Sequence, residues 1–420
     1  MTDFISRIRS QNLEDALEGP TLREGTTPPR EAGKSLGARL RWNRSAETSP
    51  LPVLIGLAAV WVFFQVENST FLTARNLSNL ATQMAVMAIL AMAVVLVLVA
   101  GEIDLSLGSI TGVTSAVLGV LITTDHWAGG AALVVALLLG LGIGLLQGAV
   151  TVLVGVPSFL VTLGGFLAWA GVQLSVIGPA GDLPVTNGVV TSIANDYLAQ
   201  WIAWILVVLS ATVLAAVEVT RYRALQRAGI DAGPPIARIV RVGLVAAGLS
   251  ALVAYLNNNF GVPDVLVVML GLAACLGWIL RRTVFGRHIY AVGGNVEASR
   301  RAGVPVGAVR IAVLGLSGLL GAVAGIVSTS NLFATSAGVG GSTLLLEAIA
   351  AAVIGGTSLF GGRGRIYQAL LGSLVIASIV NGLDLLGKAA STEEVATGVI
   401  LVLAVSLDAM NRRRRATSGH

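Results

Sequence analysis

Two carboxylates interrupt the sequence at the point where one long apolar run gives way to the next. Glu102 and Asp104 lie in the segment Ala100–Ser109 (AGEIDLSLGS), which has almost no polar loop around them. Ionised groups inside a membrane are costly and tend to be functional, so Glu102, Asp104 and the neighbouring Ser106 are candidates for lining a substrate path or a gate. A structural alternative is that Asp104 caps the helix that follows. The segment is predicted to be either a tight cytoplasmic turn or a helix broken within the bilayer.

A third carboxylate, Glu347, lies in the apolar segment Leu344–Ala350 (LLLEAIA). An ionised side chain at this place needs a partner or water. A proton relay is one interpretation, but no series of His, Asp and Glu residues continues it across the membrane. A polar contact between helices is therefore the favoured interpretation.

The residues Gly293–Gly303 (GGNVEASRRAG) have the composition of a short, self-contained helix. Asn295 can cap its N-terminus, and Glu297 then lies in the first turn, where the helix dipole favours an anion. Arg300 and Arg301 lie in the last turn, and a glycine followed two residues later by a proline ends the helix. A helix of this kind, projecting from a membrane, suits docking to a partner rather than catalysis.

Known catalytic signatures are missing from the sequence. The glycine-rich segment Gly355–Arg365 (GGTSLFGGRGR) lacks the Gly-Lys-Ser/Thr ending of a phosphate-binding loop, and no such loop occurs elsewhere. No His-Glu-x-x-His pattern or Gly-x-Ser-x-Gly elbow occurs either, and the single cysteine, Cys275, excludes an intramolecular disulfide. The chain is therefore not expected to be an enzyme or to hold a metal. The glycine-rich segment is predicted to be a tight cytoplasmic turn.

The elements that must position these residues are membrane helices. The chain has 420 residues, of which 55% are hydrophobic and 12% charged, against about 25% charged in ordinary soluble domains. No alternating pattern of a barrel occurs, and many of the 51 glycines fall inside apolar runs, where they allow close helix packing. We expect an all-α, polytopic transmembrane bundle of about 10–12 membrane segments, some of them broken or half-helices. The expected segments are approximately 51–66, 80–100, 105–123, 129–154, 157–177, 201–219, 242–257, 263–280, 310–329, 345–356, 366–386 and 395–410.

Positive charge is concentrated on one side of these alternating segments. Of the 27 lysines and arginines, 25 fall on the side that holds both termini, and only Arg75 and Lys388 fall opposite. By the positive-inside rule, both termini are predicted to be cytoplasmic. This placement explains the net charge of +5 without nucleic acid as a partner.

The chain divides into three parts by composition. Residues 1–50 are polar and are predicted to be a disordered cytoplasmic tail. Residues 51–411 form the transmembrane domain, in which 281–310 is a cytoplasmic loop. Residues 412–420 are a basic tail, and its run Arg412–Arg415 is predicted to anchor at the membrane edge.

Four motifs together resemble one family. They are GEIDLSLGS at Gly101–Ser109, PSFLVTLG at Pro157–Gly164, the segment Gly286–Gly303 and the segment Ala350–Gly364. As a set they are similar to the membrane permeases of bacterial ABC importers for monosaccharides, the ribose- and xylose-type carbohydrate uptake transporter family 2. The similarity covers nearly all of the chain beyond the tail. A longer region at about 220–260 resembles the xylose-type subgroup.

The resemblance implies that the 281–310 loop is a coupling element. In the family this element sits in a groove of a cytoplasmic ATPase and transmits its closure to the membrane helices. Ser299 stands where the broader pattern commonly has a second alanine, which is a small-for-small exchange. The implied coupling residues are Gly294, Asn295, Glu297, Ala298, Arg300, Arg301 and Gly303.

The resemblance further implies import of a monosaccharide, with D-xylose expected, across the bacterial inner membrane by alternating access. The expected partners are a second copy of the permease, a periplasmic sugar-binding protein, membrane lipid and a separate ATPase that uses ATP and Mg. No cofactor is expected on this chain. A neutral sugar needs hydrogen-bonding groups rather than a counter-charge. The candidate residues for translocation or gating are Gln83, Glu102, Asp104, Ser106, Asn331, Glu347 and Asn381.

A rival hypothesis from another class is a proton-coupled secondary sugar carrier, in which Glu102, Asp104 or Glu347 titrates. It predicts uptake that collapses with the proton gradient and persists without ATP. The importer hypothesis predicts the opposite dependence on both.

Overall fold

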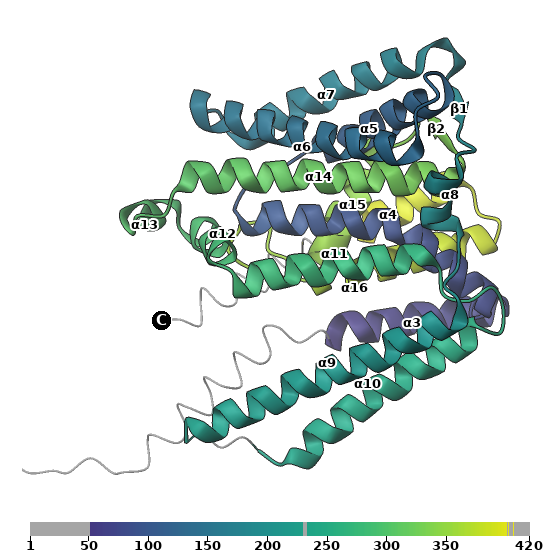
Figure 1. Ribbon diagram of the computed structural model, residues 1–420, viewed down its shortest axis with the longest axis vertical. Helices are drawn as coiled ribbons and strands as arrows, with labels where there is room; N and C mark the ends of the chain where they lie inside the picture. Colours follow the sequence, from purple (N-terminus) through teal and green to yellow (C-terminus); the bar gives the residue numbers. More distant parts are fainter. Residues whose placement is uncertain (1–50, 230–232, 401, 403–405, 407–420) are drawn as a thin grey trace, which may run out of the picture. The chain divides into compact units, whose positions relative to one another are not determined.

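The computed structural model describes residues 51–229 and 233–400, together with residues 402 and 406. The predicted tails at 1–50 and 412–420 lie outside the described residues. Most of the described chain is helical, which confirms the predicted all-α bundle (Figure 1). In this part of the chain, eight helices are long and apolar enough to cross a membrane, and three shorter apolar helices accompany them.

The elements follow one another along the chain with short connections. The helices are α3 (Leu51–Glu67), α4 (Ala74–Val99), α5 (Leu107–Thr123), α6 (Gly129–Val154), α7 (Ser158–Ile177), α8 (Gly188–Asn195), α9 (Gln200–Arg227), α10 (Pro235–Leu256), α11 (Asp264–Arg282), α12 (Val284–Gly294), α13 (Val296–Arg301), α14 (Val306–Leu332), α15 (Ser342–Ile354) and α16 (Ile366–Leu385). The other elements are the 3-10 turn η1 (Gly178–Ala180) and two antiparallel strands, β1 (Asp182–Pro184) and β2 (Ala334–Ser336). Residues 390–400 are also helical.

Several helices extend beyond the apolar segments that predict them. α9 continues to Arg227 although its apolar segment ends near 219, and α10 begins at Pro235 rather than near 242. Arginine is a good helix former, so each helix continues through the charged residues, and Gly229 and Pro234 mark the break between them. By contrast, α15 has 13 residues and rises about 20 Å, which is less than the roughly 30 Å of a hydrocarbon core. α15 is therefore a half-helix of the kind predicted.

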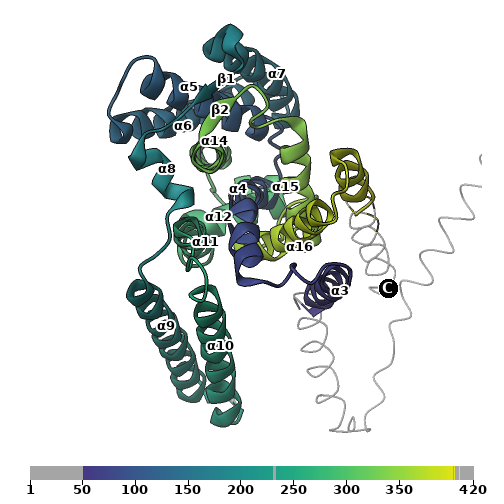
Figure 2. The ribbon, with the colours of Figure 1, turned by 90° about the vertical axis from the view of Figure 1, so that its right-hand side faces the viewer.

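The centre of the bundle is α4. It packs against α14, α16, α15 and α11, and every residue from Met84 to Val99 is buried. Figure 2 shows α4 between these neighbours. A helix that is apolar on all sides belongs where other helices surround it, and this part of α4 has no polar face. Its burial on all sides also holds the end of α4, and the chain that follows it, inside the protein.

Glycine allows α6 to pack closely on α14. A Cβ atom added to Gly144 of α6 would overlap the carbonyl oxygen of Leu314, and one added to Gly318 of α14 would overlap that of Gly140. Small residues at intervals of four let membrane helices approach to backbone contact. The packing role predicted for glycines inside apolar runs is confirmed at this interface.

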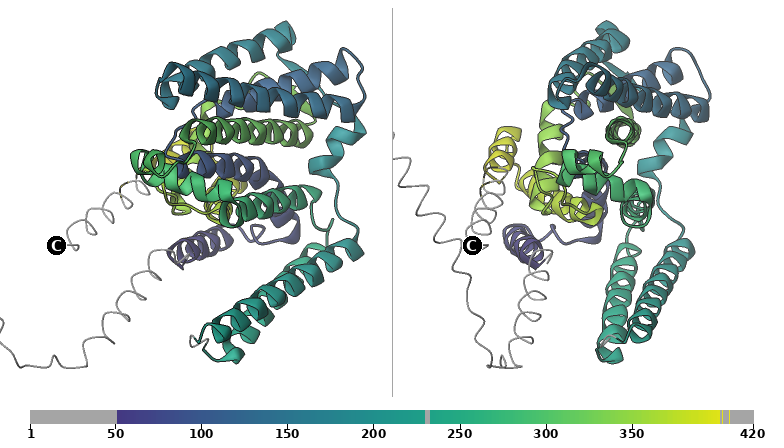
Figure 3. Two further views of the ribbon diagram at one scale, coloured as in Figure 1. Left: turned by 60° about the vertical axis from the view of Figure 1, so that its left-hand side comes forward. Right: turned by 90° about the vertical axis from the view of Figure 1, so that its left-hand side faces the viewer.

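α9 and α10 form a hairpin at the edge of the bundle. The two helices pack mainly on each other, and α10 also contacts α4. Figures 1 and 3 show them side by side along their length. At one end of the hairpin the Tyr255 hydroxyl donates a hydrogen bond to the carbonyl oxygen of Leu72 at 3.0 Å. The long region near 220–260 that the sequence singles out is therefore this hairpin.

Gly144→Val is expected to destabilise the bundle, because its side chain would overlap the backbone of α14. Overpacking of this kind costs about 1–3 kcal/mol. Gly142→Val is the matched control on the same helix, since a Cβ atom there has nothing within 4 Å. Thermal unfolding of both variants in detergent, followed by size-exclusion chromatography, measures the difference. Equal melting temperatures for the two variants would contradict the packing described.

Candidate functional site

The chain between α4 and α5 is not helical, and we call Gly101–Ser106 the broken segment. Two of its backbone amides find partners on α7: Ile103 N donates to Ser158 Oγ at 3.3 Å, and Leu105 N donates to Thr162 Oγ1 at 3.1 Å. Backbone groups that leave a helix within a membrane protein need such partners, because lipid offers none. Ser158 and Thr162 are four residues apart and lie on one face of α7. Sequence reasoning did not assign them a role, although the motif PSFLVTLG contains both at this spacing.

Asp104 is buried and held by hydroxyl and amide donors. Ser106 donates to Asp104 Oδ1 from its backbone amide at 2.9 Å and from its hydroxyl at 2.6 Å, and Ser317 of α14 donates to Oδ2 at 2.8 Å. The interpretation of Asp104 as the cap of α5 is wrong. The N-cap residue is Ser106, which makes no side-chain cap bond. Asp104 instead links the broken segment to α14.

Gln147 of α6 extends this cluster. Its side-chain oxygen lies 2.8 Å from Ser106 Oγ, whose hydroxyl also points at the Asp104 carboxylate. A hydroxyl has one proton, so Ser106 cannot donate to both acceptors. Both contacts are satisfied when the Gln147 side-chain NH2 group faces Ser106 and donates to it. The broken segment, α6 and α14 then share one buried polar cluster.

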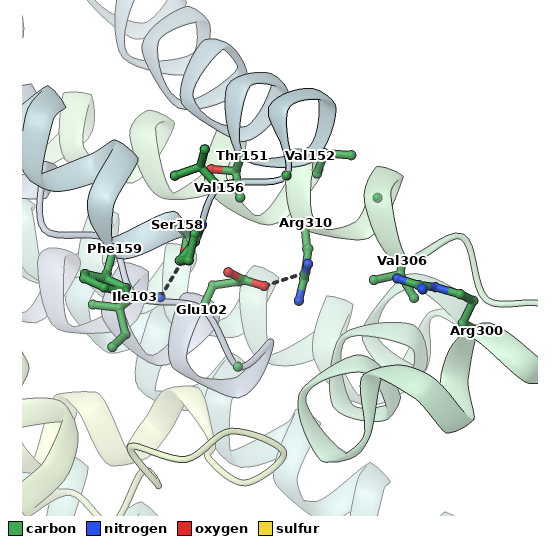
Figure 4. Close-up of a pocket in the computed structure, with 14 residues that line it drawn as sticks. Glu102, Ile103, Thr151, Val152, Val156, Ser158, Phe159, Arg300, Val306 and Arg310 are labelled. Carbon is green, nitrogen blue, oxygen red and sulfur yellow. Dashed lines mark hydrogen bonds and ion pairs between the residues drawn. The ribbon is translucent and has the colours of Figure 1, made fainter.

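Glu102 forms an ion pair with Arg310 near the start of α14, through Oε1 and Nε (Figure 4). The side chain of Glu102 is 6% exposed and that of Arg310 is 29% exposed. The pair borders a cavity of about 660 Å³ between the broken segment, the α6–α7 turn and the start of α14. Arg300 of α13 is the third charged residue of its lining. Loss of either partner of the pair would leave a charge without its counter-charge, which is costly at a buried position.

α13 has the local structure that the sequence predicts. Asn295 is its N-cap residue, and Asn295 Oδ1 accepts from Ala298 N at 2.9 Å. Glu297 pairs with Arg301 at 3.2 Å and with Arg300 at 3.9 Å. The three charged side chains are 60% to 80% exposed. The helix is therefore internally stabilised and presents its charges outward.

Glycines bound α13 on both sides. Gly303 has a φ of +79°, a backbone conformation that favours glycine, and it lies just beyond the end of the helix as predicted. On the other side Gly294 ends α12 one residue before the Asn295 cap. The connection from α13 to α14 is short, because only residues 302–305 separate them.

The end of α12 is in backbone contact with the end of α4. A Cβ atom on Gly293 would overlap the carbonyl oxygen of Val99, and Gly362 N donates to this same oxygen at 3.0 Å. A Cβ atom on Gly361 would lie 2.6 Å from Gly293 O and 3.0 Å from the Cα of Gly101. We call Gly101, Gly293, Gly361 and Gly362 the glycine junction. It brings together three motifs that are separate in the sequence: the broken segment, the α12–α13 loop and the α15–α16 turn.

A half-buried tyrosine supports the chain beside the glycine junction. The Tyr290 hydroxyl of α12 donates to the carbonyl oxygen of Gly364 at 2.6 Å. Burial raises the pKa of Tyr290 above its ordinary value of 10, and this effect outweighs the lowering by Arg281 and Arg365. The hydroxyl therefore keeps its proton and remains a donor at physiological pH. The sequence does not predict this contact, because its two partners are 74 positions apart and no local pattern indicates such a pairing.

Two of the predicted translocation residues meet at the far end of α4. Asn381 of α16 donates to Gln83 Oε1 at 3.1 Å, and Asn76 donates to Asn381 Oδ1 at 2.7 Å. These amides join α4 to α16. Gln83 lies 16 residues before the end of α4, which corresponds to about 24 Å along the helix. This amide cluster is therefore separate from the site around the broken segment.

The remaining candidates lie on other elements. Glu347 is half-buried on α15, and Asn331 lies near the end of α14. The structure thus brings Glu102, Asp104 and Ser106 together, joins Gln83 to Asn381, and leaves Glu347 and Asn331 apart from both groups. Within the described part of one chain, the seven predicted residues therefore do not form one common site.

These features define a class of protein. Apolar helices long enough to cross a membrane surround a buried polar cluster, and the capped, exposed helix α13 directly follows α12, whose Gly293 is in backbone contact with the end of the central helix α4. This is the architecture of a membrane transport permease. The family described as branched-chain amino acid transport system / permease component matches residues 76–405, and the chain belongs to this family.

Curated relatives narrow the family. The chain is 34% identical to the xylose transport system permease protein of Escherichia coli over 86% of this chain and 92% of the relative. It is 32% identical to the protein of the same name from Haemophilus influenzae, over 86% and 96%. It is 31% identical to the ribose import permease protein of Escherichia coli, over 84% and 92%. No solved structure gives a significant match. The chain is therefore an ABC importer permease of the ribose and xylose type, a multi-pass protein of the bacterial inner membrane.

Glu102→Gln and Arg310→Gln should each lower the free energy of unfolding. The double variant should lose less than the sum of the two single losses, because removing both partners leaves no unpaired charge. We expect a coupling free energy of about 0.5–3 kcal/mol from a double-mutant cycle. The matched control is the exposed pair Glu297 and Arg301, for which glutamine variants should give about 0.3–0.5 kcal/mol. Denaturant unfolding in detergent micelles measures both cycles. Additive effects at Glu102 and Arg310 would show that the ion pair contributes nothing.

Proposed function

We propose that this chain is the membrane-spanning subunit of an ATP-driven importer that moves D-xylose across the bacterial inner membrane by alternating access. The observation that carries the proposal is the capped, exposed helix α13, which directly follows α12, the helix whose Gly293 packs in the glycine junction against the end of α4. The two xylose permease relatives and the α9–α10 hairpin support xylose as the sugar. ATP and Mg act on a separate ATPase subunit.

In this proposal α13 seats in a groove of the cytoplasmic ATPase. The residues that act there are Gly294, Asn295, Glu297, Ala298, Arg300, Arg301 and Gly303. Cytoplasmic placement of α13 and of both termini follows from the arginine distribution. The exposed charges of α13 offer specific contacts, and its internal cap and ion pairs let it move as a unit.

Movement of α13 reaches the broken segment by two routes. The first runs through the short 302–305 connection into α14, where Arg310 holds Glu102 and Ser317 holds Asp104. The second runs through the glycine junction, where Gly293 contacts the end of α4. Both routes end on the same six residues, so these residues are placed to open or close the path. A second copy of the chain completes the path, and a periplasmic binding protein delivers the sugar.

The proton-coupled alternative receives less support from the contacts. Glu102 is engaged by Arg310, and Asp104 accepts three hydrogen bonds from two serines. A carboxylate that exchanges protons during transport must lose such partners in each cycle. Glu347 lies on another element, α15. The contacts favour a structural and gating role for Glu102 and Asp104 over a titrating one.

The proposal is tested by sugar uptake into proteoliposomes that contain the chain with its candidate ATPase, internal ATP and binding protein. Xylose, ribose, arabinose and galactose are compared. We expect uptake only when all three additions are present, with xylose transported fastest. Uptake by the chain alone under a proton gradient would replace the proposal with the carrier hypothesis.

Glu297→Arg is expected to reduce ATP-driven uptake by about tenfold or more, because like charges at an interface are strongly disfavoured. The double variant Glu297→Arg/Arg301→Glu keeps an oppositely charged pair four residues apart within α13 and keeps the net charge of the helix. It should remain defective if a partner recognises the arrangement of charges. Wild-type uptake and wild-type ATPase association in Glu297→Arg would remove the coupling role from α13.

A further inference from the structure

A second hollow lies between α9 and α10, at the end where the two helices are joined by residues 228–234. Its volume is about 280 Å³. It lies on the peripheral hairpin and shares no lining residue with the cavity beside the broken segment. The lining residues are Glu218, Arg221, Gly233, Pro234, Ala237, Arg238 and Arg241.

The charged side chains of this hollow are organised around one carboxylate. Glu218 pairs with Arg238 at 3.5 Å and with Arg241 at 3.4 Å. The Arg238 guanidinium also lies over the ring of Tyr222, 5.1 Å from its centroid. Glu218 and Arg238 are less than one-fifth exposed, whereas Arg241 is 68% exposed. The inner charges are thus fixed, and the outer ones remain accessible.

The region is strongly basic as a whole. From 218 to 241 the sequence contains five arginines and two carboxylates, Glu218 and Asp231, which gives a net charge of +3. Arginine presents a planar fork of donors that matches the oxygens of a phosphate group. A hollow with this lining therefore suits a phosphate-bearing anion.

The depth of the hollow points to a lipid rather than a soluble ligand. α9 has 28 residues and rises about 42 Å, so it extends beyond a hydrocarbon core of roughly 30 Å. Trp201 and Trp204 lie near its first residue, where aromatic side chains mark one membrane interface. Glu218 is 18 residues beyond Gln200, or about 27 Å along the helix, which is the level of the opposite interface. The hollow opens where lipid headgroups lie.

We propose that the hollow between α9 and α10 binds the phosphate headgroup of an anionic phospholipid, with Arg221 and Arg241 as its outer ligands and Arg238 as its inner one. Basic pockets between membrane helices bind acidic headgroups in this manner. A hollow of about 280 Å³ has room for several water molecules and accommodates a phosphodiester. If the region were only attracted to the membrane surface as a whole, every arginine in it would contribute equally to lipid binding. A specific site instead depends on the arginines that line the hollow.

The sequence offers a matched control for that distinction. Arg221→Gln/Arg241→Gln removes two lining arginines and leaves the more buried Arg238 in place. Arg223→Gln/Arg227→Gln removes the same charge from exposed residues of the same helix end that do not line the hollow. Binding of phosphatidylglycerol to the full chain in detergent is followed by native mass spectrometry, with phosphatidylcholine and glycerol phosphate as comparison probes.

We expect the lining variant to weaken phosphatidylglycerol binding by about tenfold or more, and the control variant by less than about threefold, since charge-assisted bonds are lost only in the first. Glu218→Gln, which keeps all arginines and removes the competing carboxylate, should tighten binding. Equal losses in both double variants would reduce the effect to general attraction and overturn the site. Binding of glycerol phosphate as strong as that of the lipid, or equal binding of phosphatidylcholine, would also overturn it. None of these readouts depends on transport.

Discussion

The break between α4 and α5 is the constraint on which the rest of the structure depends. A bilayer offers no partners to backbone groups, so a helix that stops inside the bundle must find donors and acceptors within the protein. α7 supplies the acceptors through Ser158 and Thr162. α14 binds the two carboxylates of the broken segment, since Ser317 donates to Asp104 and Arg310 forms an ion pair with Glu102. Because α4 is buried on all sides from Met84 to Val99, the position of the break is held by the centre of the bundle.

The glycine junction explains how an exposed helix can act on that centre. Long side chains would place flexible contacts between α12 and α4, whereas Gly293 lets the backbone of one touch the backbone of the other. Backbone contact transmits displacement with little loss, since neither partner can change rotamer. The same junction receives Gly361 and Gly362 from the α15–α16 turn, so three segments are in contact at one point. In the coupling that we propose, the residues before α13 act together with α13 itself.

Local features could be predicted from the sequence, and contacts between distant segments could not. The cap at Asn295, the charges of α13 and the apolar helices each depend on neighbours within about four residues, and all are confirmed. A cap is one of the two roles that the local sequence permits for Asp104. Its actual partner on α14 is 213 positions away, and no pattern within one segment identifies it. The same limit explains why no role follows from the sequence for Ser158, Thr162 and the contacts of the glycine junction, although the family motifs contain all of these residues.

The central claim is that displacement of α13 reaches the broken segment, and thiol labelling at Ile103 tests it most directly. Ile103 is 42% exposed and lines the cavity beside α13. In a chain whose exposed Cys275 is replaced by serine, Ile103→Cys is labelled in the assembled transporter with and without ATP. The account predicts that ATP changes the labelling rate severalfold and that Glu297→Arg abolishes the change. Identical rates with and without ATP, in an assembly that still imports sugar, would contradict it.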